Sequence, residues 1–197
     1  AVYFEKGELL KELGDFAGAS TAYASVPEKD SEELFKNALY ELGDAYVKLD
    51  NPSKAREALE RYDGLSPGDD RISSATLQMI QIDLDGKNFA RAAESAEVLA
   101  KEHPQDPLID IIYYKWGVAL AALNKFTHAA EAFQTVTRCT PPSKLYAEAV
   151  YGMALSYENN GQIMEAIADY EKLGSSFPDH SLTQEALSRL GYLYVQT

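Results

Sequence analysis

The sequence predicts an all-α fold, a solenoid of about five and a half helix-turn-helix repeats with about eleven helices. Three observations predict it. A residue that is usually small recurs every 36 or 37 positions along the 197 residues. An alanine follows each of the first five of these residues at a constant distance, and a proline or a serine follows that alanine. A fixed period of this size is the signature of stacked repeats.

The repeats can be aligned on the recurring residue, which we call position 0. Position 0 holds Gly7, Gly43, Ile80, Gly117, Ala154 and Gly191. Position +12 holds Ala19, Ala55, Ala92, Ala129 and Ala166. Position +16 holds Tyr23, Leu59, Ala96, Phe133 and Tyr170. Position +24 holds Ser31, Pro67, Pro104, Pro141 and Pro178. Short side chains at positions 0 and +12 let two helices approach closely where they cross, while bulky neighbours fill the flanks.

Apolar periodicity, caps and breakers place the helices in order. We expect helices near 2–13, 16–26, 31–49, 52–63, 70–85, 89–102, 107–123, 127–138, 144–159, 163–175 and 181–196. They form repeats at about 1–30, 31–68, 69–105, 106–142 and 143–180, with a partial repeat at 181–197. We expect one solenoid domain over 1–197. Because the sequence lacks an initiating Met and starts and stops inside helices, we expect it to come from a longer chain.

Short turns rich in Gly, Asn and Asp join the two helices of each repeat. Gly and Asn accept the left-handed conformation that ends a helix, and Asp and Asn can cap the next helix. The turns are Gly14-Asp15, Asp50-Asn51-Pro52, Gly86-Lys87-Asn88, Asn124-Lys125 and Gly161-Gln162. The third repeat leaves its register open, because Ile80 and Asp83 occupy the packing positions in one alignment and Met79 and Ile82 in the other.

These residues resemble the tetratricopeptide repeat (TPR) family over essentially the entire chain. The fourth repeat carries its pattern at Tyr113, Trp116, Gly117, Leu120, Phe126, Ala129, Phe133, Val136 and Pro141. The resemblance implies a right-handed α-α superhelix that binds proteins. The period is longer than the usual 34 residues, and this variant resembles repeats of bacterial cell-envelope proteins, including periplasmic coordinators and outer-membrane assembly lipoproteins. It therefore favours a periplasmic or outer-membrane-associated location, with the cytoplasm as the alternative.

The charge balance restricts the partners. Thirty-one Asp and Glu oppose 18 Lys and Arg, for a net charge of −13, and a chain without a basic stripe is a poor binder of nucleic acid or anionic lipid. We expect a protein or peptide ligand of basic or amphipathic character, although the charge can also serve solubility alone. No apolar run approaches the roughly 18 residues of a membrane span, so we expect no direct membrane insertion.

No arrangement of residues predicts catalysis, a cofactor or a metal. The three histidines, His103, His128 and His180, lie in different repeats and lack metal-ligand spacing. The single Cys139 has no internal disulfide partner. Nucleophile, phosphate-binding and dinucleotide motifs are missing from the sequence. We therefore expect a protein that is not an enzyme.

The TPR resemblance places two rows of residues on the concave face that the first helices of the repeats form. Position −3 contributes the candidate partner-binding residues Phe4, Tyr40, Tyr114 and Tyr151, in a row completed by Leu77 and Ser188. Position +1 contributes the candidates Glu8, Asp44, Val118, Leu155 and Tyr192, together with Gln81. The first half of the face would be acidic and the second half apolar. Aromatic rings suit recognition of a peptide, but rings at helical spacing also pack inside proteins, and both interpretations stay open.

The leading hypothesis is a non-catalytic scaffold that binds a peptide or protein segment in the concave groove, in a setting such as cell-envelope assembly. A second hypothesis is self-association through the last helix, where Leu187, Leu190 and Tyr194 lack a partner helix. A third is a regulatory domain of a larger enzyme.

Overall fold

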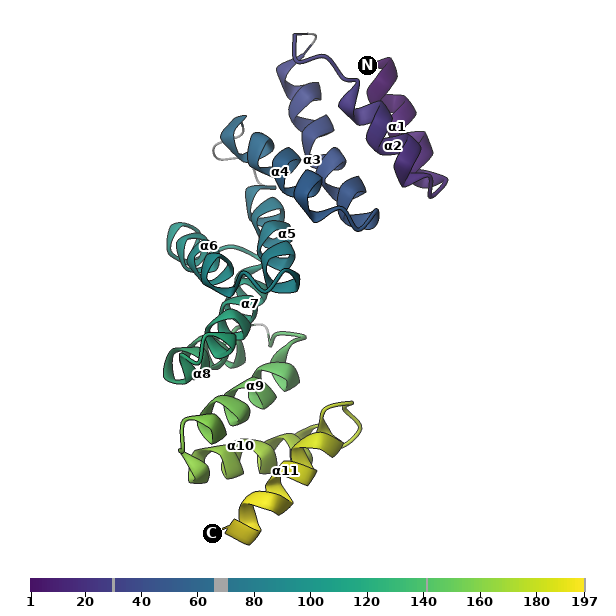
Figure 1. Ribbon diagram of the computed structural model, residues 1–197. Coiled ribbons are helices and arrows are strands. Elements are labelled where there is room, and N and C mark those ends of the chain that lie inside the picture. The colour runs from purple at the N-terminus through teal and green to yellow at the C-terminus, as the bar shows by residue number, and fades with distance from the viewer. Residues whose placement is uncertain (30, 66–70, 141, 197) are drawn as a thin grey trace. The chain divides into compact units, whose positions relative to one another are not determined.

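The computed structural model describes residues 1–29, 31–65, 71–140 and 142–196, and these contain helices and turns but no strand (Figure 1). The helices are α1 (Val2–Glu12), α2 (Phe16–Ala24), α3 (Glu32–Lys48), α4 (Pro52–Leu65), α5 (Ile72–Asp85), α6 (Phe89–Glu102), α7 (Ile109–Ala122), α8 (Phe126–Thr137), α9 (Tyr146–Asn159), α10 (Ile163–Ser176) and α11 (Thr183–Gln196). The predicted class is confirmed, and the expected helix ends agree to within about two residues. The predicted helix stops at Pro67 and Pro141 lie outside the described residues.

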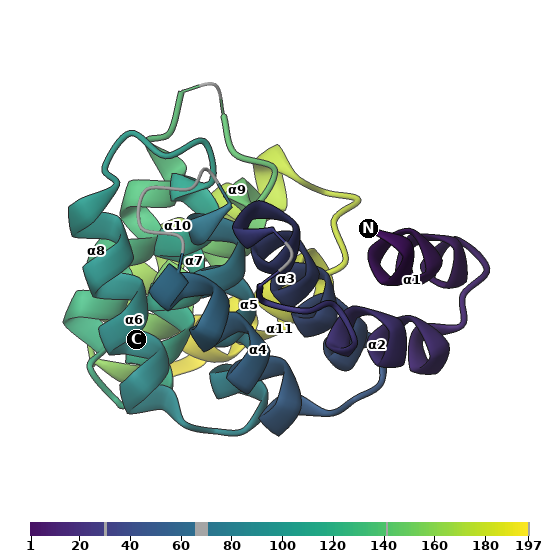
Figure 2. The same ribbon diagram turned by 90° about the horizontal axis from the view of Figure 1, so that it is seen from above.

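The chain divides into two compact units, Ala1–Ile82 and Asp83–Thr197. We call the odd-numbered helices the A helices and the even-numbered helices the B helices. The first unit holds α1 to α4 and most of α5, and Figure 2 shows α1 and α2 as adjacent rods. The second unit holds α6 to α11, which pack on one another in chain order. The single domain expected over 1–197 stays a prediction.

Glycines mark the helix crossings in both units. A Cβ added at Gly43 would lie 2.6 Å from the Leu59 side chain, and one at Gly117 would lie 2.8 Å from the Phe133 ring. The same ring lies 2.7 Å from a Cβ added at Gly152 of the next A helix. At these glycines α3 approaches α4, and α7 and α9 approach α8, more closely than a methyl group on the glycine would allow. All five alanines at position +12 are fully buried.

The turns repeat one backbone conformation. The residue at position +7 has a positive φ in all five complete repeats, at Gly14, Asp50, Lys87, Asn124 and Gly161. The next amide donates to the carbonyl of position +3, as in the 2.9 Å bond from Lys125 to Leu120. This is the hydrogen bond of a Schellman motif. In the third repeat Lys87 takes the left-handed conformation that the sequence suggested for Gly86.

Side-chain caps begin three helices of the first unit. Asp15 accepts from the amide of Gly18 at 2.9 Å, and Ser31 and Asn51 accept equivalent bonds at 3.3 Å. The corresponding Asn88 makes no such bond at α6. The sequence therefore predicted which residue types stand at the cap positions, but not which of them form a capping hydrogen bond.

The third repeat keeps the alignment that places Ile80 and Asp83 at the packing positions. Both side chains are fully buried, whereas Met79 and Ile82 are half-buried. The buried Asp83 carboxylate is compensated by the Arg91 guanidinium, which lies 3.0 Å away on α6. Burial of a charge is tolerated when an opposite charge and hydrogen bonds accompany it.

Candidate protein-binding face of the A helices

The predicted partner-binding residues lie on the A helices of both units. In the first unit Phe4 and Glu8 lie on α1, and Tyr40 and Asp44 lie on α3; all four are half-buried.

In the second unit the candidates vary in exposure. Tyr114 and Val118 on α7 are half-buried, as is Leu155 on α9. Tyr151 is only 9% exposed and Tyr192 on α11 is 61% exposed. Only Tyr192 therefore offers most of its side chain to solvent.

The aromatic rings at position −3 are anchored by rings of the B helix in the same repeat. The ring centroids lie 5.4 to 6.1 Å apart in the pairs Phe4–Tyr23, Tyr40–Tyr62, Tyr114–Phe133 and Tyr151–Tyr170. Tilted and edge-on rings at this distance attract one another and bury apolar area. The packing role that the sequence left open is thus real, and the remaining exposed part of each ring is held in a fixed orientation.

Tyr114 and Tyr151 at position −3 each interact with the glutamate at position −6 of the following A helix. Burial, and then a hydrogen bond to Glu185 of α11, raises the pKa of Tyr151 to about 12. Burial, followed by the charge of Glu148 on α9, raises the pKa of Tyr114. Both phenols stay protonated near neutral pH and keep their hydroxyl as a donor.

The first unit contains a charged bridge between consecutive A helices. Lys11 of α1 is hydrogen-bonded to Glu41 of α3. Burial opposes the charge of Lys11, but Glu41 and the nearby Asp44 and Glu8 carboxylates together raise its pKa. This half of the face therefore carries three carboxylates around one ammonium, in agreement with the predicted acidic character.

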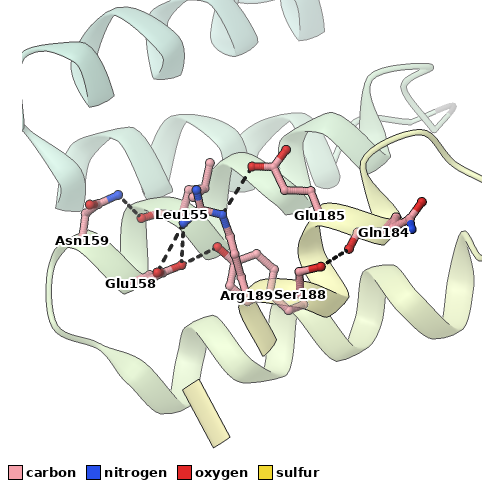
Figure 3. Close-up of polar contacts among 8 residues, drawn as sticks. Leu155, Glu158, Asn159, Gln184, Glu185, Ser188 and Arg189 are labelled. Atoms are coloured by element: carbon pink, nitrogen blue, oxygen red, sulfur yellow. Dashed lines mark hydrogen bonds and ion pairs between the residues drawn. The ribbon is translucent and has the colours of Figure 1, made fainter. Parts of the chain in front are cut away.

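The second unit contains the same bridge with the charges exchanged. Arg189 of α11 lies between Glu158 of α9, at 3.4 Å, and Glu185 of its own helix, at 3.5 Å (Figure 3). Lys11 and Glu158 both occupy position +4, and Glu41 and Arg189 both occupy position −2 of the next repeat. The expectation of a simply apolar second half is incomplete, because this charged group lies beside Leu155.

A buried tyrosine at position +16 accompanies each bridge, through the bridge residue Glu158 in the second unit and through Glu8, a carboxylate near Lys11, in the first. The Tyr23 hydroxyl donates to Glu8, and the Tyr170 hydroxyl donates to Glu158 at 2.7 Å. Both rings are at most 1% exposed. Sequence reasoning recorded the tyrosines but missed Glu41, Glu158 and Arg189. The signal was present, since opposite charges stand at positions +4 and −2 of successive repeats.

A pocket of about 960 Å³ opens beside Tyr114 in the second unit. Its walls are the start of α7, Pro104 to Leu108 before it, and the segments around Cys139 and Leu145. Asp110 accepts from the Ser143 hydroxyl and from the Ile111 amide, so its carboxylate ties these walls together. Burial lowers the pKa of Lys115 at the same wall, while Asp85 acts in the opposite direction.

Other activities find no matching site in the described residues. These residues contain no cluster of three or more His, Cys, Asp or Glu that could hold a metal ion. No helix in the described part of the chain combines the length and hydropathy that crossing a bilayer requires.

Comparisons with known proteins give the family and the fold. Residues 32–195 match the family YfiO, described as outer membrane lipoprotein. Outer membrane protein assembly factor BamD of Pasteurella multocida is 21% identical over 178 residues, which are 89% of this chain and 61% of that protein. The chain thus spans less than two thirds of this relative.

Solved structures share the fold at low identity. A tetratricopeptide repeat protein from Parabacteroides merdae has a TM-score of 0.81 and 16% identity, with 98% of this chain and 72% of that chain covered. A MamA structure has a TM-score of 0.74 and 22% identity, with 88% and 89% covered. These similarities confirm the tetratricopeptide-repeat fold.

Proposed function

The chain belongs to the YfiO family of outer membrane lipoproteins, and from that premise we propose that it is a non-catalytic scaffold that binds a protein segment along the A helices. Its setting is outer membrane protein assembly, on the periplasmic side of the outer membrane. The BamD relative supports this setting by its name, and the TPR fold supports protein binding. The ligand is a peptide or protein segment of basic or amphipathic character.

The observation that carries the proposal is the preorganised row at position −3. Its rings are packed on B-helix rings, so partner binding would order few side chains further. Rigid aromatic surface with a polar tip gives much contact area for little loss of conformational entropy. The carboxylates near Lys11 add a preference for basic side chains in the first unit.

Tyr192 is the sharpest probe of this face, because it is 61% exposed and can be removed without a cavity. Tyr194 is its matched control: it lies on the same helix, is 52% exposed and points to a different side of α11. A photocrosslinking amino acid placed at position 192 in cells would identify the partner by mass spectrometry, and one placed at position 194 should not capture it.

The affinity of that purified partner is then measured by calorimetry for the wild type, Tyr192→Ala and Tyr194→Ala. We expect Tyr192→Ala to weaken binding by on the order of 1–2 kcal/mol, and Tyr194→Ala to leave it unchanged. Equal effects of the two substitutions, or no effect of Tyr192→Ala on any crosslinked partner, would remove the A-helix face as the binding site.

A further inference from the structure

The pocket beside Tyr114 lies at the junction of the fourth and fifth repeats, within the second unit. Its volume of about 960 Å³ is that of a site for a small molecule or a few residues of a peptide. Ile109, at the start of α7, and Thr140, after the end of α8, form part of its wall. Ile109 is half-buried and Thr140 is exposed, so a ligand can reach both side chains.

The next junction, between the fifth and sixth repeats, is closed by side chains of the chain itself. One period of 37 residues relates the two junctions, so Tyr146 is the equivalent of Ile109 and Phe177 is the equivalent of Thr140. The centroids of the Tyr146 and Phe177 rings lie 5.6 Å apart, and both rings pack against the core of this unit. Leu190 of α11 is buried in the same core, in contrast to the expectation that it lacks a partner helix.

The pocket lacks the two rings of the closed junction. In their place it has an aliphatic side chain and a short hydroxyl side chain, those of Ile109 and Thr140. An aromatic ring buries a large apolar area against such a wall. Because two rings of the chain itself fit the same repeat geometry one period later, a ring supplied by another molecule fits the pocket.

The charged side chains of the pocket favour an acidic ligand. Asp106 accepts from a backbone amide at 2.7 Å, and Asp110 accepts from a hydroxyl and from a second amide. Both carboxylates are therefore engaged by the chain. Lys144 is exposed at the pocket wall and makes no hydrogen bond or ion pair with the described residues. Burial lowers the pKa of Lys115 at the same wall, and a nearby carboxylate would favour its charged form.

We propose that this pocket binds an aromatic side chain of an amphipathic protein segment that carries an Asp or Glu close by in its sequence. The ring packs against Ile109 and Thr140, and the acidic side chain pairs with Lys144. This assignment rests on the proposed scaffold function, because the segment belongs to the partner that the scaffold binds. Tyr114 connects the two sites, since it lies in the row at position −3 and also lines the pocket.

An NMR titration of the isotope-labelled chain with a short peptide tests the pocket directly. The probe is the acetylated and amidated peptide of residues 175–181, Ser-Ser-Phe-Pro-Asp-His-Ser, in which Phe177 is followed by Asp179. We expect the largest amide shifts in residues 104–115 and 142–145. Phe177→Ala or Asp179→Lys within the peptide should each weaken binding by about tenfold or more. Equal binding of either altered peptide, or shifts outside the pocket alone, would overturn the proposal.

Two variants of the chain provide the complementary test. Thr140→Phe copies a ring of the closed junction and should fill the pocket, so that the peptide binds about tenfold or more weakly. Circular dichroism and thermal unfolding monitor its folding. Lys144→Glu should weaken the probe and restore binding of the Asp179→Lys peptide, because the charges are exchanged. Lys125→Glu, at another exposed lysine of this unit, is the matched control and should leave the affinity unchanged. Unchanged affinity in Lys144→Glu would overturn the proposal even if Thr140→Phe fails to fold.

The partner captured at position 192 separates this inference from the proposed function. Thr140→Phe and Lys144→Glu should weaken that partner, whereas Tyr192→Ala should leave the affinity of the peptide unchanged, because Tyr192 is not part of the pocket. A partner that depends on Tyr192 but binds both pocket variants normally would overturn the pocket proposal and leave the A-helix face intact. A partner that is weakened by the pocket variants but not by Tyr192→Ala would support the pocket and count against that face.

Discussion

The α1–α3 pair in the first unit and the α9–α11 pair in the second solve the same packing problem with opposite charges. Lys11 and Glu41 join the first pair, and Glu158 and Arg189 join the second, at identical repeat positions. A buried tyrosine at position +16 donates to a glutamate of the same repeat in both. The repeat geometry therefore fixes which two positions form an ion pair, whereas either position can carry the positive or the negative charge.

The helix crossings give the largest expected effect. Gly117→Ala places a methyl group about 3 Å from Phe133, and we expect it to lower the free energy of unfolding by about 2–3 kcal/mol, since a packed core resists added volume. Gly191→Ala at the same repeat position meets no neighbour and should raise stability by up to about 1 kcal/mol. Urea unfolding measures both. Destabilisation by both substitutions would show that backbone conformation, not side-chain contact, selects glycine.

Loss of the hydroxyls of the buried Tyr23 and Tyr170 should give the second-largest effect on stability. Tyr23→Phe and Tyr170→Phe each remove a hydroxyl that donates to a glutamate, and each should lower the free energy of unfolding by about 1–2 kcal/mol. Glu158 keeps its ion pair with Arg189 at 3.4 Å, whereas Lys11, the cation near Glu8, is paired with Glu41, so the loss should be smaller in the second unit. Leu59→Val, an apolar change at position +16, controls for packing. A larger loss for Tyr170→Phe than for Tyr23→Phe would contradict this account.

The exchanged charges predict a reversal experiment. Lys11→Glu places a fourth carboxylate near Glu8, Glu41 and Asp44, and we expect a loss of about 1 kcal/mol. Adding Glu41→Lys should restore most of it, because the second unit shows that the inverted pair fits these positions. Thermal unfolding at low and high salt would measure the coupling. If the double variant is no more stable than Lys11→Glu, the two bridges are not interchangeable.

Asp169 makes the two units respond differently to pH. It occupies position +15, where Ala22, Ala58 and Ala132 are buried, and burial raises its pKa to about 6. Its Oδ2 atom is buried without a hydrogen-bond partner. The native state therefore holds a proton that the unfolded state has released, so the group favours folding near pH 4 and that contribution is lost as the pH rises through about 6.

Replacing Asp169 by alanine, the residue that three other repeats have at position +15, tests this difference. We expect Asp169→Ala to stabilise the chain at pH 7.5 by roughly 0.5–1 kcal/mol, a value reduced for the partial exposure of the carboxyl, and to have less effect at pH 4.5. Ala132→Gly, at the same position of the preceding repeat, serves as a control without a titrating group. An effect of Asp169→Ala that does not change with pH would rule out the titration.

Particular residues show how far the sequence could lead. The alanines at position +12 are all buried, and Gly7, Gly43 and Gly117 at position 0 lie at crossings, because a regular period leaves only one set of residues small enough for close approach. The candidate face was harder to predict. The position of Tyr151 followed from its spacing, but its 9% exposure depends on Tyr170 of α10 and Glu185 of α11.

The sequence by itself determined the helices, their turns and their alternation, because propensity, capping and periodicity act over a few neighbouring residues and recur at every repeat. Only the tertiary structure decided which charges meet and which rings remain accessible. Those properties depend on side chains 12 to 31 residues apart in the chain, as Tyr170 with Glu158 and Arg189 with Glu158 show. Burial and distance in three dimensions, not local preference, set their energies.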